Sequence, residues 1–339
     1  MPRPSLIASS TPIPAPLPDR SLDPEAELPT VVIRSAGLHP FIYQKMVVGP
    51  TGGIAAVPGD LVRIVDRERV QIGYGLWNPR SRISLRVVSR EPDPPGLDFW
   101  ARKIGDAVAL RTRFLGLDRE TNAYRVIHAE GDGLSGLIVD RFDDVLSAEV
   151  FSLGIYQRIG PILKICGDLL GTKHARVRVD DWIAKLEGFP GRPAETPNLP
   201  PRVTIEEHGI RYRIRFDQGH KTGFFCDQRE NRRRLAEFCR DQSVLDLCCY
   251  TGGFGLNALI RGKARDVTCV DLDEKVVAQA RENGNANQVR LDVVHADAFG
   301  YMRQMVQNGK RFGVVVLDPA KLITDRDEVS LGKRKYYDM

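Results

Sequence analysis

The segment from residue 243 to residue 320 repeatedly alternates a short apolar run with a helical segment. The apolar runs are SVLDLCC, DVTCVDLD, VRLDVVHAD and FGVVVLDPA, and the first three are followed by GFGLNALIR, EKVVAQARENG and AFGYMRQMVQN. Buried strands that alternate with helices form a parallel sheet through right-handed crossovers. The sequence therefore predicts an α/β fold whose ligands bind at the carboxyl ends of the strands.

The glycine-rich turn YTGGFG follows the first of these strands and begins the first helix. A phosphate-binding P-loop needs a lysine followed by serine or threonine after its last glycine, and this turn has neither. A dinucleotide-binding turn favours the spacing GxGxxG, with the pyrophosphate at the helix N-terminus. Asp246 lies inside the preceding strand, and its negative charge disfavours a diphosphate at this turn.

Acidic residues at three successive strands instead favour S-adenosylmethionine, which carries a sulfonium and an ammonium group but no phosphate. Asp246 suits the positive charge, and the next strand places Asp271 where it can accept both ribose hydroxyls. The third strand places Asp297 where it can bond the adenine amino group. Gly252 and Gly253 let the backbone approach the methionine moiety. Each aspartate alone also makes a good helix N-cap, which is the structural alternative.

The fourth strand ends in Asp318-Pro319. A polar side chain followed by rigid backbone can bond the edge of a planar nucleobase beside a methyl donor, so this dipeptide indicates a base-facing position. The structural alternative is a strand that ends at a proline, because proline donates no hydrogen bond to a sheet.

The residue pattern changes several times in the rest of the chain. Five runs rich in β-branched residues, separated by glycine and proline turns, indicate a small β-barrel; they are TVVIR, IAAVPGD, LVRIVD, VQIGYGLW and RISLRVVS. The first residues are rich in proline and poor in large apolar groups, which predicts disorder. The predicted parts are a disordered tail at 1–28, the barrel at 29–91, an α+β middle domain at 98–202 and the parallel-sheet domain at 203–339.

Charge and cysteine usage favour a nucleic-acid partner in a reducing compartment. The formal net charge is +5, and arginine supplies 37 of the 49 cationic residues; its planar guanidinium matches phosphates and base edges. The six cysteines show neither zinc-ligand spacing nor a disulfide framework. Since no apolar run has membrane-spanning length and no leader is evident, the sequence predicts a soluble, cytoplasmic protein without a metal site.

Several motifs together resemble one family. The segments GHKTGFFCDQRENRR, VLDLCCYTGGFG, VTCVDLDEK, VHADAF and VVVLDPAK are similar to the RlmI-type class I methyltransferases, which make 5-methylcytosine in 23S ribosomal RNA. The barrel resembles the PUA domain of that family, an RNA-binding module, and AYRVIHAEGDGLSGLIVDRF resembles its middle domain. The resemblance covers about 31–339 and implies S-adenosylmethionine as cofactor and ribosomal RNA as partner, and it leaves the oligomeric state open.

The resemblance also implies site residues at the matching positions. A loop that covers the donor would contain Lys221, Thr222, Gly223, Phe225 and Gln228. The methionine half of the donor would be lined by Asp246, Tyr250, Thr251, Gly252 and Gly253. Asp271 would hold its ribose and Asp297 its adenine. Asp318 and Lys321 would act at the target base.

Two departures from the family pattern bear on catalysis. The family's Asp-Pro-Pro-Lys-Phe is Asp-Pro-Ala-Lys-Leu here, which changes base stacking at Ala320 and Leu322. The family's chain also continues through further strands and a Ser-Cys-Ser element, so we expect this sequence to be incomplete after its fourth strand. Methylation of cytosine C5 needs a thiolate that adds to C6, and we expect that thiol beyond Met339. Cys248 and Cys249 are predicted to be core packing.

Three functions therefore remain open from the sequence. The first is methylation of cytosine C5 in large-subunit ribosomal RNA. The second is methylation of a base nitrogen, for instance of guanine, which needs no cysteine. The third is a non-catalytic module that binds RNA and the donor without turnover.

Overall fold

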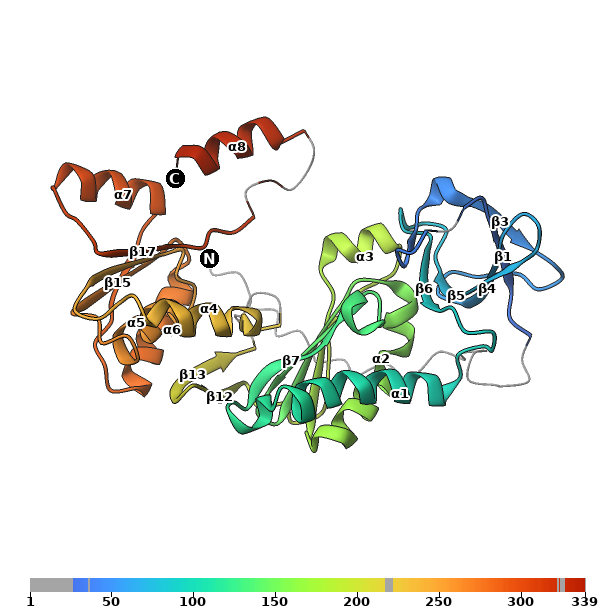
Figure 1. The fold of residues 1–339 in the computed structure, drawn as a ribbon, viewed down its shortest axis with the longest axis horizontal. Coiled ribbons are helices and arrows are strands. Elements are labelled where there is room, and N and C mark those ends of the chain that lie inside the picture. The colour runs from blue at the N-terminus through green and yellow to red at the C-terminus, as the bar shows by residue number, and fades with distance from the viewer. Residues whose placement is uncertain (1–26, 36, 217–221, 322, 324–326, 339) are drawn as a thin grey trace, which may run out of the picture. The chain divides into compact units, whose positions relative to one another are not determined.

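The computed structural model describes residues 27–338 apart from 36, 217–221, 322 and 324–326 (Figure 1). The predicted disordered tail lies outside the described residues except for its last two positions. The described residues form two compact units. The first comprises the chain up to Pro201 together with the described part of 219–224, and the second comprises Arg202 onwards without that segment. The first junction is next to the predicted boundary at residue 203.

A six-stranded sheet occupies the beginning of the first unit (Figure 1). Its strands are β1 (Thr30–Ile33), β2 (Phe41–Ile42), β3 (Val47–Thr51), β4 (Leu61–Val65), β5 (Gln71–Trp77) and β6 (Leu85–Ser89), in the order β2-β6-β5-β4-β1-β3, with the short helix η2 (Gln44–Met46) before β3. The run IAAVPGD forms no strand, contrary to the expectation from its β-branched residues. Pro58 lacks an N–H for pairing, Gly59 has φ of 96°, and Asp60 Oδ2 accepts a bond from Val57 N at 2.9 Å, so these residues form a turn.

The remainder of the first unit is an α+β layer around a five-stranded sheet. Its strands are β7 (Ala123–His128), β8 (Leu137–Phe142), β9 (Val145–Val150), β10 (His174–Arg178) and β11 (Ala194–Glu195), in the order β11-β10-β9-β8-β7. Its helices are α1 (Leu97–Ala109), η3 (Leu110–Phe114), η4 (Leu117–Arg119), η5 (Ala129–Asp132), α2 (Leu153–Leu170) and α3 (Asp181–Glu187). A tight turn joins β8 to β9 at Asp143, where φ is 56°.

One hydrophobic core joins the barrel to this layer. It contains Tyr74 and Leu76 of the barrel together with Trp100 of α1 and Ile155 of α2. Arg158, which is buried, donates from Nη1 to the carbonyl of Gly59 at 2.8 Å. The barrel and the α+β layer are therefore packed as a single body, although the sequence places a proline-rich linker between them.

The second unit is a four-stranded parallel sheet with a hairpin beside it. The hairpin is β12 (Arg202–Glu207) and β13 (Ile210–Arg215), and the sheet strands are β14 (Ser243–Leu247), β15 (Asp266–Asp271), β16 (Asp292–His295) and β17 (Val314–Leu317), in the order β16-β15-β14-β17. The helices are η6 (Cys226–Gln228), α4 (Arg229–Ala236), α5 (Gly253–Ile260), α6 (Glu274–Ala286), α7 (Ala298–Gln307) and α8 (Val329–Asp338). All three strand pairings are parallel, which confirms the predicted α/β fold.

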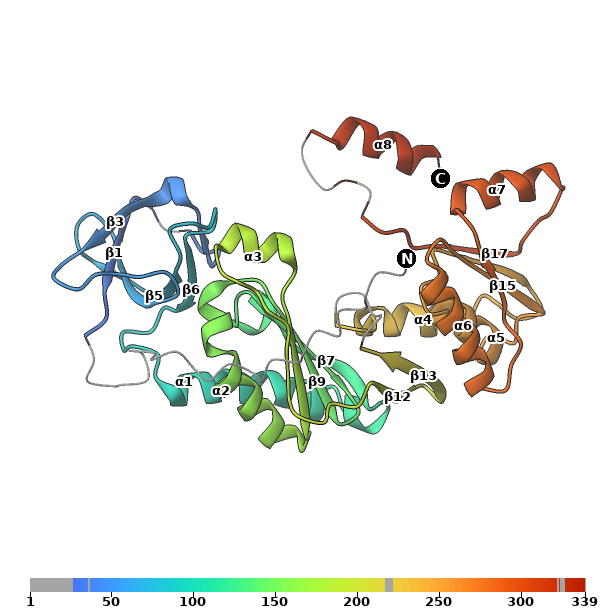
Figure 2. The same cartoon turned by 180° about the vertical axis from the view of Figure 1, so that it is seen from behind.

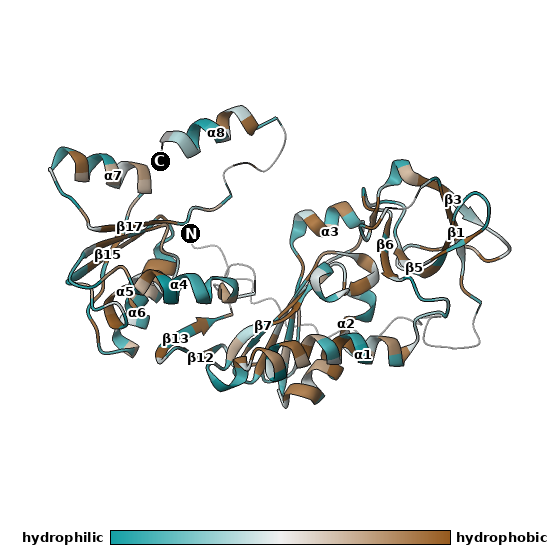
Figure 3. Cartoon of the chain, viewed as in Figure 1, coloured by the Kyte–Doolittle hydropathy of each residue, from teal (hydrophilic) through white to brown (hydrophobic). Residues whose placement is uncertain are grey.

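Helices cover both faces of this sheet. Figures 1 and 2 show α4, α5 and α6 on one face and α7 on the other. The strands are coloured mainly as hydrophobic in Figure 3, whereas α4 is hydrophilic along most of its length. Val244, Leu247 and Val270 have no exposed surface, while Val315 and Leu317 of the edge strand β17 are 54% and 41% exposed. Because β14 has β15 on one side and β17 on the other, the order reverses at its carboxyl end, where open α/β sheets bind ligands.

Candidate active site

The backbone is strained immediately after β14. Cys248 and Tyr250 have φ of 57° and 50°, and Gly252 has φ of 80°. A left-handed conformation at a residue other than glycine costs of order 1–3 kcal/mol and persists only where the surroundings enforce it. Here Tyr250 N donates to Asp271 Oδ2 at 2.9 Å, and Asn283 Nδ2 donates to the carbonyl of Thr251 at 3.0 Å. These hydrogen bonds thus hold the predicted glycine turn in its left-handed conformation.

Asp246 lies beneath this turn with no exposed surface. Its Oδ2 accepts a hydrogen bond from Gly255 N at the beginning of α5, at 2.9 Å. Its Oδ1 is buried and has no hydrogen-bond partner among the described residues, and the same holds for Oγ1 of Thr251. Buried polar atoms are nearly always paired, so two such atoms at one turn indicate groups that a ligand satisfies.

Burial above all, together with the nearby carboxylates of Asp318 and Asp271, raises the pKa of Asp246 from its usual value to about 7, against the lowering effect of the hydrogen bond from Gly255 N. Two carboxylates near a third, at the end of adjacent parallel strands, make this site electronegative. A cationic ligand would relieve that repulsion, whereas a diphosphate would increase it. The residues present therefore fit the sulfonium and ammonium groups of S-adenosylmethionine.

Asp271 holds the turn with one oxygen and the chain after β15 with the other. Oδ2 accepts from Tyr250 N, and Oδ1 accepts from Asp273 N at 3.0 Å. Asp273, not Asp271, caps α6, through a bond from Lys275 N. Each carboxylate oxygen has a second lone pair, so these two bonds still allow Asp271 to accept from ribose hydroxyls. Its role toward the ribose stays a prediction.

Asp297 is exposed and is the N-cap of α7, where its Oδ1 accepts from Gly300 N at 2.8 Å. Asp297 is therefore a helix N-cap in this structure, which is the structural alternative given above for each aspartate. The predicted role toward adenine stays a prediction.

Two residues of the predicted donor loop lie near the other predicted site residues of the second unit. The rings of Phe225 and Tyr250, in the turn, meet edge to face with centroids 5.0 Å apart. Gln228 Nε2 is 3.5 Å from Asp318 Oδ2, at the end of β17. In the second unit the structure thus brings Phe225 to the predicted methionine wall and Gln228 to the predicted base-facing aspartate. Lys321 is exposed three residues beyond Asp318.

Thr222 belongs to the first unit, and its predicted place in the donor loop stays a prediction. Its side chain is buried, its Oγ1 donates to Asp140 Oδ2 at 2.6 Å, and its carbonyl accepts from Ser147 Oγ at 2.8 Å. The Thr222 hydroxyl is therefore bonded to β8, and the Thr222 carbonyl to β9. Gly223 follows with φ of 130°, which favours glycine, and Lys221 lies outside the described residues.

Arg232 and Glu207 support the site and were missed by sequence reasoning. Their side chains are 3% and 0% exposed, and Arg232 makes two parallel bonds of 2.8 Å to the Glu207 carboxylate. Arg232 Nη1 also donates to the carbonyl of Phe225 at 3.0 Å. A Cβ at Gly253 would lie 3.0 Å from Arg232 Cδ, so the second turn glycine makes room for this arginine. The alternation VTIEE puts Glu207 in phase with two apolar residues, and this was the available signal for a buried charge.

The cysteines of the described chain are not poised for nucleophilic attack. Five are buried, and Cys248 is half-buried. Burial raises the pKa of the Cys248 thiol to about 11, and that of Cys166 to about 12. A hydrogen bond with Cys269, together with burial, raises the pKa of Cys249. These thiols are protonated at neutral pH, and only the thiolate is nucleophilic.

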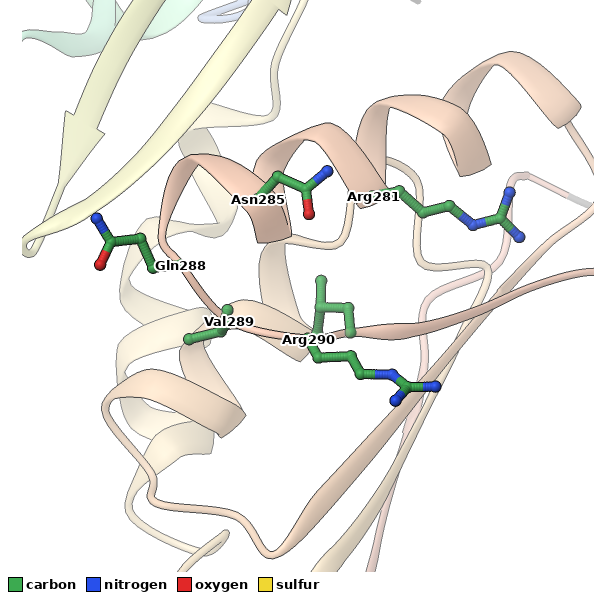
Figure 4. A pocket seen from close by; sticks show the side chains of 6 residues that line it. Arg281, Asn285, Gln288, Val289 and Arg290 are labelled. Atoms are coloured by element: carbon green, nitrogen blue, oxygen red, sulfur yellow. The ribbon is translucent and has the colours of Figure 1, made fainter.

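Figure 4 shows a surface hollow of about 490 Å³ at the carboxyl end of α6. Its lining residues are Arg281, Asn285, Gln288, Val289, Arg290 and Leu291. The hollow lies where β16 begins, whereas the predicted ligand-binding carboxylates lie where the strands end. None of the predicted site residues lines it. No group of three or more metal-ligating side chains is present among the residues that the structure describes, nor is any described helix long and apolar enough to cross a membrane.

Two family models match the chain. A PUA-like domain matches residues 33–90, and an S-adenosylmethionine-dependent methyltransferase domain matches residues 173–326. Two solved structures share the fold, one of a Streptococcus mutans protein and one of SMU.776 in complex with SAH. Both align with a TM-score of 0.71 at 17% identity, covering 90% and 88% of this chain and 82% and 77% of theirs. The fold and site thus define an S-adenosylmethionine-dependent methyltransferase with an N-terminal PUA-like domain.

Curated relatives place the chain more closely. A protein of Tolumonas auensis named ribosomal RNA large subunit methyltransferase I is 33% identical over 312 residues, and one of the same name from Shewanella frigidimarina is 34% identical over 309 residues. Each alignment covers 89% of this chain and 77% of the relative. The chain belongs to the ribosomal RNA large subunit methyltransferase I family, as its motifs predicted.

Proposed function

We propose that this methyltransferase acts in the cytoplasm on large-subunit ribosomal RNA and methylates cytosine at C5. The observation that carries the donor half of the proposal is the buried, unpaired oxygen of Asp246 under the strained turn. The name of the relatives and the PUA-like domain support ribosomal RNA as the substrate. S-adenosylmethionine supplies an electrophilic methyl group when it is bound.

The residues of this chain have separate tasks in that reaction. Asp246 and Thr251 offer their unpaired oxygens to the methionine half of the donor, and the turn glycines let the backbone come close. Asp271 holds the turn and, with its remaining lone pairs, the ribose. Asp318 is exposed at the end of β17, beside Gln228, and would bond the edge of the target base.

A base-nitrogen product is the second candidate, and the cysteines favour it. Addition of a thiolate to C6 activates cytosine C5 for attack on the methyl group. None of the cysteines in the described residues combines exposure with a lowered pKa. Methylation of a guanine nitrogen would need only the donor site and a base-facing polar group such as Asp318.

Nucleoside analysis of treated RNA tests both candidates. Large-subunit ribosomal RNA would be incubated with the full chain and isotopically labelled donor, then digested, and the labelled nucleosides identified by mass spectrometry. Labelled 5-methylcytidine would support the C5 proposal and would call for a thiol other than the buried ones described above, whereas labelled methylguanosine alone would replace the C5 proposal with the nitrogen one. Donor binding measured by calorimetry without any labelled nucleoside would indicate a binding module.

A further inference from the structure

A second cavity lies in the first unit, between the barrel and the five-stranded sheet. It has a volume of about 520 Å³ and is lined by both regions and by α3. The residues that matter for its chemistry are Phe41, Tyr43, Arg86, Glu130 and Trp182. We call this cavity the barrel–sheet cleft.

Buried hydrogen bonds fix the walls of the barrel–sheet cleft relative to each other. Glu187, at the end of α3, is 4% exposed and accepts from Ser81 Oγ at 2.6 Å and from Asn78 Nδ2 at 3.0 Å, both on the barrel. Its Oε2 also accepts from Leu153 N at 3.2 Å, at the beginning of α2. A cleft whose walls are tied in this way is formed before any ligand arrives.

Two aromatic side chains at the cleft are left largely in solvent. Trp182 is 65% exposed and Tyr43 is 44% exposed, whereas Trp77 and Trp100 are 5% and 4% exposed. Tryptophan is normally among the more buried residues, because its ring removes a large apolar area from water. An exposed indole on the wall of a cavity provides a surface on which a planar group can stack.

The polar groups of the cleft suit the edge of a nucleobase. Arg86 is buried, and its guanidinium lies 5.0 Å from the centroid of the Phe41 ring. Its Nε is buried and has no hydrogen-bond partner among the described residues. The carboxylate of Glu130, 3.8 Å from Arg86 Nη1, is 35% exposed and can accept further bonds. The cleft therefore has a buried cation with an incomplete set of partners in its wall and an accessible acceptor beside the aromatic surfaces.

The charge of the chain is concentrated on the same region. Residues 29–91 contain nine lysines and arginines and four acidic residues, an excess of five positive charges. The whole chain has a formal charge of +5, so the rest of the sequence is balanced. This distribution attracts a polyanion to the barrel and so to the mouth of the cleft.

We propose that the barrel–sheet cleft binds one unpaired nucleobase of the RNA substrate, stacked on Trp182, while its phosphates follow the basic surface of the barrel. The base must be unpaired, because a base inside a helix exposes no face for stacking. The assignment of RNA to this cleft rests on the proposed function, whereas the cleft itself shares no residue with the donor site.

Tryptophan fluorescence gives a direct test, because Trp182 is the only strongly exposed residue among the three tryptophans. The full chain would be titrated with a short single-stranded RNA of mixed sequence and with the same sequence as a duplex. We expect the single strand to quench the emission and to bind more weakly as salt rises. Trp182→Ala should weaken binding by about ten-fold to one-hundred-fold, and Trp182→Phe should recover most of the loss.

Phe114→Ala is the matched control, since Phe114 is 82% exposed in the same unit but does not line the cleft. It should leave RNA affinity unchanged, and Trp182→Ala should leave donor affinity measured by calorimetry unchanged. Equal quenching by single strand and duplex, or wild-type affinity in Trp182→Ala, would overturn the proposal. If the wild type methylates RNA but RNA does not quench the emission of Trp182, only the proposal about the cleft is wrong. If RNA quenches the emission but no nucleoside is methylated, only the proposed reaction is wrong.

Discussion

Each unit contains a fully buried aspartate, and the two have opposite surroundings. Asp140 of the first unit accepts bonds from Arg125 Nε at 2.9 Å, Arg125 Nη2 at 3.2 Å and Thr222 Oγ1 at 2.6 Å. Asp246 of the second unit accepts through Oδ2 from Gly255 N at 2.9 Å and from the Cys269 thiol at 3.9 Å, whereas its Oδ1 has no partner in the described chain. A buried charge with a complete set of partners holds the fold together, whereas one left incomplete is prepared for a ligand.

The same contrast extends to a second polar atom. Near Asp246 the buried Oγ1 of Thr251 also has no hydrogen-bond partner in the described chain, whereas around Asp140 the arginine and the threonine satisfy both carboxylate oxygens. Left-handed residues other than glycine occur near both aspartates, at Asp143 and at Cys248 and Tyr250. Unpaired buried polar atoms therefore distinguish a binding site from a structural ion pair more clearly than burial or backbone strain does.

Removal of the saturated carboxylate should have the largest effect on stability. Asp140→Ala leaves Arg125 without its partner and frees Thr222, so we expect a loss of about 3 kcal/mol in the free energy of unfolding. All three tryptophans lie in the first unit, so their emission during urea unfolding reports on that unit alone. Asp168→Ala removes one half of an exposed i,i+4 pair and should change stability by less than about 0.5 kcal/mol. A similar change in both variants would contradict the structural role of Asp140.

Neutralising the unsaturated carboxylate should affect binding instead. Asp246→Asn retains an oxygen for the bond from Gly255 N but removes the charge that faces a cationic ligand. We expect the free energy of donor binding to weaken by about 2 kcal/mol, as is typical for loss of a charged hydrogen bond. We expect no loss of stability, because the substitution removes a buried charge. Calorimetric titration with S-adenosylmethionine measures the first effect. An unchanged dissociation constant would show that Asp246 is structural.

The pKa of about 7 at Asp246 predicts a pH dependence of the same site. Donor binding requires the carboxylate, so affinity should fall about ten-fold for each pH unit below 7 and level off above it. Without the donor, the folded protein binds more protons than the unfolded chain between the ordinary pKa and about 7, so stability should decline as pH rises through that range. Asp246→Asn should abolish both slopes, and slopes that persist in the variant would assign them to another group.

The smallest effect is expected at Asp297, the N-cap of α7. Asp297→Ala should reduce the local stability of α7 by about 1 kcal/mol, and Asp297→Asn should restore most of it, since asparagine caps equally well. Hydrogen exchange of the α7 amides measures this difference. A loss of donor affinity in Asp297→Ala without any change in exchange would favour the predicted adenine role over the cap.

The sequence predicted the second unit better than the first because its signals are local. Alternation of apolar runs with helical segments defined the parallel sheet, and the glycine turn with Asp246 predicted where the donor binds. The run IAAVPGD failed as a strand because Pro58 and Gly59 decide its backbone more strongly than its β-branched residues do. Arg232 was hidden in a basic run that is typical of a solvated helix face, yet it is buried against Glu207.

The sequence by itself determined the fold class and the methyl donor, because these depend on periodicity, glycine spacing and the position of acidic residues relative to strand ends, and the resemblance of its motifs indicated the family. Only the tertiary structure decided which polar atoms are satisfied. Thr222 proved to be occupied by Asp140, Asp246 retained an unpaired oxygen, and Trp182 remained exposed beside a cleft. Pairing and burial of this kind depend on contacts between residues far apart in the chain, which no local pattern specifies.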